Sequence, residues 1–169
     1  MNEFTNAGGD GQVQGCIDQN YIDDVKQIAQ AYRERPDQIV DILHKVQALR
    51  NYLPPEAMAA VAKVLDLPES QVYSVATFYS MFSVVPRGRH IIRVCESPPC
   101  HVMGSERMLD VVSRFLNVEP GRTTSDGRFT LETTSCLGVC GVAPAMMIDD
   151  DVHGNLSPGD VPGILARYQ

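Results

Sequence analysis

The sequence predicts an α+β protein, with a helical N-terminal subdomain followed by a smaller α/β domain. Apolar residues recur at helical spacing up to about residue 82, whereas β-branched residues at strand spacing begin at residue 90. The breaker Pro86-Arg87-Gly88 separates the two patterns, which is typical of a boundary. We therefore expect a flexible polar tail at 1–18, a four-helix subdomain at 19–86 and an α/β domain at 87–169.

Prolines divide the helical subdomain into four predicted helices. The first covers 21–33, and Pro36, Pro55 and Pro68 each fit the start of a following helix, where the missing N–H of proline costs nothing. Within each segment the apolar residues repeat every three or four positions, which predicts one buried face per helix. The residues expected on these faces are Ile22, Val25, Ile28, Ala29, Tyr32, Ile39, Ile42, Leu43, Val46, Leu49, Met58, Val61, Val64, Leu65, Val72, Val75, Ala76, Tyr79 and Phe82.

The segment 76–82, ATFYSMF, carries more aromatic residues than one buried helix face requires. Apolar residues at helical spacing usually pack in a core. Exposed aromatic side chains, in contrast, mark protein interfaces. Core packing is the favoured interpretation of this segment, and a patch that faces a partner protein is the alternative.

The second domain has the predicted order β-α-β-β-β-α. Its strands are expected at 90–94, 129–134, 145–148 and 152–156, with one helix at 104–116 and another that Pro158 opens. A helix between the first two strands favours a parallel, right-handed crossover. The acidic turn 149–151, expected to be solvated, favours a hairpin between the last two strands. This arrangement is thioredoxin-like, and Pro144, just before the third strand, is a candidate for a cis peptide bond.

Composition excludes several classes of function. The formal net charge is −7, so the chain lacks the basic surface that nucleic acids or anionic membranes require. No apolar run approaches the roughly 18 residues of a membrane span, and the N-terminus lacks the basic start and apolar core of a signal peptide. We expect a cytoplasmic protein, in which paired cysteines favour metal or redox chemistry over disulfides.

Four of the five cysteines form two close pairs. Four residues separate Cys95 from Cys100, and three separate Cys136 from Cys140. Both pairs lie in loops after predicted strands, and loops that follow neighbouring parallel strands emerge at the same sheet edge. Four thiolates suit zinc, or iron with bridging sulfide. Cys16 lies apart in the tail and is expected to be a free thiol, rather than a fifth ligand or an intersubunit disulfide.

Spacing and compartment favour an iron–sulfur cluster over the alternatives. Both loops are wider than the two-residue spacing most common in structural zinc sites, and the absence of a C-x-x-C weakens a redox dithiol. Gly138 and Gly141 would let the second loop curl and aim N–H groups at sulfur. For His101, a place beside the ligands or at a helix end is favoured over ligation. A structural zinc-binding interaction module is the alternative function.

Three motifs together resemble the family of the 24 kDa subunit of respiratory complex I: VATFYSMF, VCESPPCH followed by MGS, and SCLGVCGVAPAMMIDD with a following LSP. Small subunits of NAD-linked hydrogenases and formate dehydrogenases are relatives, and the resemblance covers about residues 20–169. It implies four helices before a thioredoxin-like domain, with one [2Fe-2S] cluster on Cys95, Cys100, Cys136 and Cys140. It also implies a larger partner subunit that carries FMN, an NAD(H) site and a [4Fe-4S] cluster.

The expected function is therefore electron transfer with the flavin of that partner. The chain has no GxGxxG, no P-loop and no plausible catalytic base, so nucleotide and flavin are expected on the partner only. It would be a non-catalytic subunit of an NADH-dependent oxidoreductase complex, with the helical subdomain as its docking surface. Complex I, an NAD-linked or electron-bifurcating hydrogenase and an NAD-linked formate dehydrogenase are all consistent with the motifs.

The loop Glu96-Ser97-Pro98-Pro99 departs from the small residues usual in this family. Pro98 and Pro99 have no N–H, so the backbone can offer sulfur only the donors of Glu96, Ser97 and Cys100. Glu96 also adds a negative charge. Because both features favour the oxidised cluster, we predict a lower reduction potential than with Gly-Thr-Ala in this loop. An equal or higher potential for the natural loop in a redox titration would contradict this.

Overall fold

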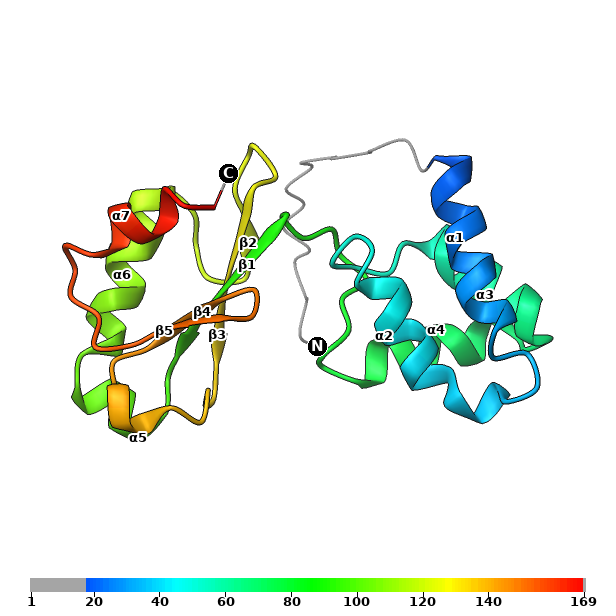
Figure 1. Cartoon of the computed structure of the whole chain (residues 1–169), viewed down its shortest axis with the longest axis horizontal. Helices are drawn as coiled ribbons and strands as arrows, with labels where there is room; N and C mark the ends of the chain where they lie inside the picture. Colours follow the sequence, from blue (N-terminus) through cyan, green and yellow to red (C-terminus); the bar gives the residue numbers. More distant parts are fainter. Residues whose placement is uncertain (1–17, 169) are drawn as a thin grey trace, which may run out of the picture.

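The structure is a computed structural model, and it describes residues 18–168. The chain forms two bodies that lie side by side, a bundle of helices and a sheet with helices of its own (Figure 1). Their buried apolar residues form separate clusters, one within 21–82 and the other within 92–165. Cys16 and nearly all of the predicted tail lie outside the described residues. None of the helices in the described part of the chain has the length and apolar character needed to cross a membrane.

The first body contains the four predicted helices. They are α1 (Gln19–Gln30), α2 (Ile39–Gln47), α3 (Pro55–Leu65) and α4 (Glu69–Phe78), and a 3-10 turn, η1 (Pro36–Gln38), precedes α2. The expected apolar faces are buried or packed against the core, with two exceptions, Leu49 and Tyr79. Both lie beyond the helix that was expected to carry them, since α2 ends at Gln47 and α4 at Phe78. Beyond those ends the helical repeat no longer directs the side chains to the buried face, although Phe82, which also lies beyond α4, is buried.

The second body is built on a five-stranded sheet in the order β2-β3-β1-β4-β5. The strands are β1 (His90–Cys95), β2 (Arg122–Thr123), β3 (Phe129–Thr134), β4 (Met146–Ile148) and β5 (Asp151–His153). β1 and β3 are parallel, and β4 and β5 form an antiparallel hairpin, which confirms both predicted connections. β4 also pairs with β1 in the antiparallel sense. The Ala143–Pro144 peptide before β4 is cis.

Two helices, α6 (Ser105–Leu116) and α7 (Val161–Leu165), cover one face of the sheet (Figure 1). Alternation along the strands turns every second side chain toward these helices. The core between them is almost wholly aliphatic. Its most deeply buried members are Ile92, Val94, Val112, Leu131, Met146, Ile148, Val161 and Leu165.

Some boundaries in the second body differ from the prediction. The last strand covers 151–153 rather than 152–156, and the last helix begins at Val161 rather than at Pro158. The delay has a local cause, because the Asp160 carboxylate accepts hydrogen bonds from the N–H and the hydroxyl of Ser157 and closes a turn there. Three short elements were not predicted, namely β2, the helix α5 (Pro98–Val102) and the 3-10 turn η2 (Cys140–Val142). Each is too short to show an apolar period.

The acidic turn 149–151 is more than a solvated turn. The Asp149 carboxylate accepts a hydrogen bond from the N–H of Ile91 at 2.9 Å and lies 2.7 Å from Nδ1 of His90. The Tyr168 hydroxyl donates to the Asp151 carboxylate at 2.9 Å. The turn is solvated as expected, with Asp150 and Asp151 exposed, and these contacts in addition fasten the β4–β5 hairpin to β1 and to the C-terminal segment.

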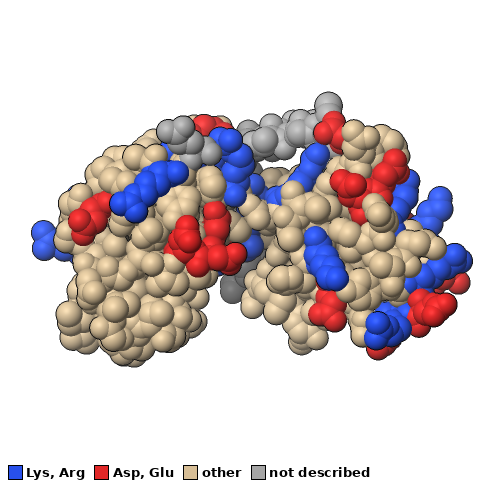
Figure 2. All heavy atoms as spheres, in the orientation of Figure 1, with Lys and Arg blue, Asp and Glu red and all other residues tan. Residues whose placement is uncertain are grey.

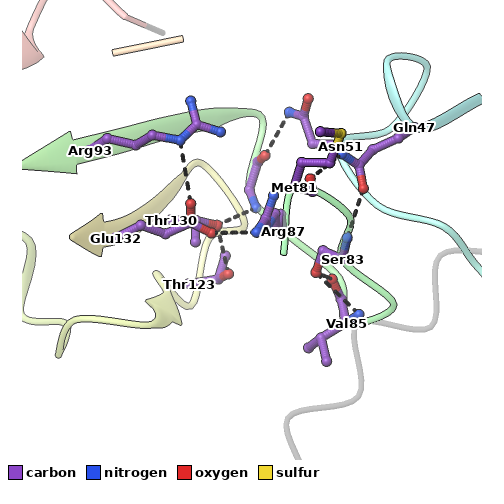
Figure 3. A network of polar contacts seen from close by, with 11 residues as sticks. Gln47, Asn51, Met81, Ser83, Val85, Arg87, Arg93, Thr123, Thr130 and Glu132 are labelled. Atoms are coloured by element: carbon purple, nitrogen blue, oxygen red, sulfur yellow. Dashed lines mark hydrogen bonds and ion pairs between the residues drawn. The ribbon is translucent and has the colours of Figure 1, made fainter. Parts of the chain in front are cut away.

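Hydrogen bonds to both bodies fix the junction at Gly88, and Figure 3 shows Asn51 and Thr130, the side chains that make them. The side-chain amide of Asn51, in the helical body, donates to the carbonyls of Gly88 and Arg89, at 3.0 Å each. The N–H of Gly88 donates to Oγ1 of Thr130 in β3 at 2.6 Å. A Cβ at position 88 would lie 2.8 Å from the backbone of Phe129, closer than real Cβ atoms approach. The junction therefore requires glycine.

An ion-pair network continues from this junction into the sheet. The Arg87 guanidinium lies 2.8 Å from the carboxylate of Glu132 in β3, and the same carboxylate lies 3.6 Å from Nε of Arg93 in β1 (Figure 3). On the helical side, the Gln47 amide accepts from the N–H of Ser83 and donates to the carbonyl of Met81. The connecting segment is thus bonded along its length rather than free.

Candidate metal centre

Both cysteine loops leave the same edge of the sheet. Cys95 is the last residue of β1 and pairs in register with Thr134, the last residue of β3. Cys136 follows two residues later, so the parallel pairing brings the second loop beside the first. In Figure 1 the loops lie at the lower end of the sheet, around α5.

The first pair is buried within its loop. Cys95 is 2% exposed and Cys100 is 1% exposed. Pro98 and Pro99 occupy the first positions of α5, where a helix needs no N–H. This single helical turn brings Cys100 back to Cys95, so that hydrogen bonding between the two thiols influences the pKa of each.

Hydrogen bonds make Cys95 the more acidic thiol of this pair. Burial on its own raises the pKa of Cys95, but the Ser97 hydroxyl, 3.2 Å from the sulfur, acts against it. With the backbone N–H groups of Ser97 and Leu137, it lowers that pKa to about 7. Burial raises the pKa of Cys100, and the hydrogen bond with Cys95 raises it further. Cys95 is therefore partly a thiolate at neutral pH, the form that binds metal.

The second pair is exposed. Gly138 has a φ of 79°, and its N–H donates to Sγ of Cys136 at 3.3 Å, which confirms the expected N–H···S contact at this glycine. Gly141 makes no such contact among the described residues. Cys140 begins a 3-10 turn, η2 (Cys140–Val142). The Leu137 side chain packs against the buried first pair, so the second loop lies over it.

The donor set fits an iron–sulfur cluster. Within residues 18–168, no three His, Cys, Asp or Glu side chains converge as ligands of one ion. The thiols are instead presented as two pairs, one on each loop. A two-iron cluster takes four thiolates, and the two loops together supply four cysteines, Cys95, Cys100, Cys136 and Cys140.

His101 stands outside this arrangement. Its side chain is exposed in the last turn of α5 and makes no hydrogen bond to another described residue. The structure thus gives no support to ligation by His101. Its position in the last turn of α5 agrees with the place at a helix end that the sequence favoured.

Sequence reasoning missed two details of the first loop. It counted only backbone donors, and so overlooked the hydroxyl of Ser97, whose side chain is buried beside Cys95. It also counted the N–H of Glu96, which instead donates to the carbonyl of Thr134 at 2.9 Å and extends the ladder between β1 and β3. The serine two residues after a cysteine was the available signal, since a buried hydroxyl seeks a partner.

The sequence matches the family of thioredoxin-like [2Fe-2S] ferredoxins over residues 25–169. It is 46% identical to a subunit of the NADH-quinone oxidoreductase of Salmonella typhimurium over 130 residues, which are 77% of this chain and 78% of that protein. It is 37% identical to the NADP-reducing hydrogenase subunit HndA of Solidesulfovibrio fructosivorans over 145 residues, 86% of this chain and 85% of that one.

Among solved structures, an air-oxidised NAD+-reducing [NiFe]-hydrogenase has the same fold. The TM-score is 0.66 at 24% identity, and the match covers 75% of this chain. The chain spans only 22% of the length of that hydrogenase chain. At this identity the match speaks for the fold, that is, for helices followed by a thioredoxin-like sheet.

Proposed function

We propose that this chain, which belongs to the family of thioredoxin-like [2Fe-2S] ferredoxins, carries its one [2Fe-2S] cluster on Cys95, Cys100, Cys136 and Cys140 and is an electron-transfer subunit. The observation that carries the proposal is the parallel register of β1 and β3, in which Cys95 lies opposite Thr134. Because of that register, the two cysteine loops meet at one sheet edge. The bound cluster accepts and releases one electron at a time.

The protein prepares this site in three ways. Hydrogen bonds from Ser97 and the Leu137 N–H favour the thiolate of Cys95. The N–H of Gly138 is directed at the sulfur of Cys136, and Leu137 shields the buried pair from water. Donors directed at sulfur stabilise the more negative, reduced cluster. The exposed second pair would leave one side of the cluster close to the surface, where an electron can pass to a partner.

We propose further that the partner is a larger subunit of the same complex, one that binds FMN and NAD(H). Two relatives are named as subunits, one of an NADH-quinone oxidoreductase and the other of an NADP-reducing hydrogenase. The chain itself contains neither a GxGxxG nor a P-loop, which supports placing the nucleotide on the partner. We place the complex in the cytoplasm, where reduced thiols remain available.

The two separate apolar cores support a division of the chain into functional parts at residues 19–86 and 87–169. The second part would hold the cluster, and the helical first part would contribute to the contact with the partner.

Anaerobic purification followed by metal analysis and spectroscopy tests this function. We expect a reddish protein that contains iron and sulfide. After one-electron reduction with dithionite it should give a rhombic electron paramagnetic resonance signal. A colourless protein with one zinc and no reducible centre would instead establish a structural zinc module. A protein with neither metal, whose thiols cycle through a disulfide, would also contradict the proposal.

A further inference from the structure

We propose that a hollow at the junction of the two bodies binds the phosphate groups of a small organic molecule. Residues 48–52, 86–89 and Gly127 line this junction hollow, which has a volume of about 500 Å³. The junction precedes β1 and Cys95 ends β1, so the length of a strand separates the hollow from the cysteine loops. The site is therefore additional to the proposed electron transfer and does not depend on it.

The junction hollow is basic, although the protein as a whole is acidic. Arg50, Arg87 and Arg89 are among its lining residues, which include no Asp or Glu, whereas the formal net charge of the chain is −7. Figure 2 shows blue side chains on both sides of the gap between the bodies, near its upper end. Guanidinium groups suit phosphate, because their planar fork can donate two parallel hydrogen bonds to its oxygens.

The ion pairs beside the hollow leave part of this positive charge uncompensated. Glu132 is shared by two guanidinium groups, that of Arg87 at 2.8 Å and that of Arg93 at 3.6 Å. Burial lowers the pKa of Arg87, even though the charge of Glu132 acts in the opposite direction. Because arginine stays protonated at neutral pH, a further negative charge in the hollow would stabilise this largely buried cation.

Arg50 and Arg89 are available to a ligand. Arg89 is exposed and forms no ion pair with a described residue. Arg50 pairs with Asp18 at 3.5 Å, but the Asp18 side chain is 69% exposed, and a pair as exposed as this contributes little. The Asp126 carboxylate accepts the N–H of Arg128 at 3.0 Å, inside its own turn. Neither Asp18 nor Asp126 is among the residues that line the hollow.

The hollow is formed before any ligand arrives. The Asn51 side-chain amide donates to the carbonyls of Gly88 and Arg89 at 3.0 Å each (Figure 3). The N–H of Arg89 donates to the carbonyl of Gly127 at 3.1 Å. These bonds join all three lining segments to one another. The walls are thus held in place, which lowers the entropy cost of binding.

Two of the lining side chains suit the organic part of the ligand. Leu49 is 43% exposed and Tyr52 is half-buried, and both line the hollow together with the arginines. A flat ring can pack against an aromatic side chain such as that of Tyr52. Sites for small molecules are commonly hollows of about 300–1,000 Å³ where two domains meet, with apolar walls and a few charged groups. The junction hollow meets these conditions.

Titration calorimetry of the full chain with ADP, in phosphate-free buffer at low salt, tests this site. ADP is the probe because it joins a diphosphate to a flat ring, and we expect a Kd below about 1 mM. Arg50→Gln and Arg89→Gln should each weaken the Kd at least about tenfold, because each removes a charge-assisted hydrogen bond. Arg122→Gln is the matched control, because Arg122 is also exposed but lies in β2, outside the hollow. It should change the Kd by less than about threefold.

Further ligands separate the two parts of the site. Adenosine, which carries no phosphate, should bind at least about tenfold more weakly than ADP. Inorganic phosphate should compete with ADP but bind more weakly, because it does not reach Leu49 and Tyr52. Absence of ADP binding, equal binding of ADP and adenosine, or equal binding of ADP and phosphate would each overturn the proposal. An equal loss of affinity in Arg122→Gln would also overturn it.

The same samples keep this proposal distinct from the proposed function. Circular dichroism first shows that each variant is folded, and paramagnetic resonance reports the cluster. A chain that holds the cluster but does not bind ADP would overturn the phosphate site and leave electron transfer intact. A chain that binds ADP but holds no cluster would overturn the proposed function and leave the phosphate site intact.

Discussion

Removing the hydroxyl of Ser97 should lower the reduction potential of the cluster. The hydroxyl lies 3.2 Å from Sγ of Cys95, on a side chain that is only 8% exposed. Water therefore cannot readily replace it in a Ser97→Ala variant. Pro98 and Pro99 supply no N–H nearby, and the N–H of Glu96 is already bonded to Thr134. The hydroxyl is thus one of the few donors that the first loop offers to sulfur.

The magnitude follows from the change in charge on reduction. A hydrogen bond to a charged group contributes about 1.5–3 kcal/mol. Reduction adds only one negative charge, which is shared over the whole cluster. The hydrogen bond from Ser97 should therefore be stronger in the reduced than in the oxidised cluster by about 1 kcal/mol. One electron and a tenfold change in equilibrium correspond to about 59 mV and about 1.4 kcal/mol, so the potential should fall by about 40 mV.

A redox titration followed by paramagnetic resonance measures this shift. Ser135→Ala is the control, because Ser135 precedes Cys136 and its exposed hydroxyl makes no hydrogen bond to the described residues. In the metal-free protein, Ser97→Ala should also raise the pKa of Cys95 above its value of about 7. An unchanged or higher potential for Ser97→Ala, or an equal fall for Ser135→Ala, would refute the reasoning.

Three further predictions test the site and the fold. In the metal-free protein, iodoacetamide should modify the exposed second cysteine pair before the buried first pair, and simultaneous modification of all four would contradict the described burial. Gly88→Ala should lower the free energy of unfolding by about 1–3 kcal/mol. Gly159→Ala, with nothing within 4 Å of the new Cβ, should change that free energy little. Equal denaturation midpoints for the two variants would contradict the requirement for glycine at position 88. Burial raises the pKa of Tyr21 and Tyr168 to about 12, with the Asp151 carboxylate adding to the effect at Tyr168. The contribution of these two raised pKa values to folding stability is present below pH 10 and is lost as the pH rises through 12. An alkaline titration of tyrosine absorbance in which every tyrosine had ionised near pH 10 would contradict the raised pKa values.

Most of the fold could be predicted because long periodic patterns decide it. Four apolar stripes separated by prolines predicted four helices, and a helix between two β-branched runs predicted the parallel pairing of β1 with β3. The elements that escaped prediction were decided by single contacts. The Asp160 carboxylate, for example, closes a turn on Ser157 and delays the last helix, and two-residue β2 forms only because β3 lies beside it.

The candidate site was predictable in its residues but not in its geometry. Spacing could place the cysteines in two loops at one sheet edge, because that follows from the topology of the sheet. It could not show that Cys95 and Cys100 are buried while Cys136 and Cys140 are exposed, since burial depends on how the second loop packs. Nor could it separate Phe78, which is exposed, from Phe82, which is buried, because the helix ends between them.

Iron and sulfide analysis of single cysteine variants tests the central claim most directly. The account predicts about two irons and two sulfides per chain for the unchanged protein and for Cys16→Ser, with an intact paramagnetic resonance signal. Serine at position 95, 100, 136 or 140 should in each case lower the iron content or alter that signal. A full cluster with an unchanged signal in any one of these four variants would contradict the assignment, as would loss of the cluster in Cys16→Ser.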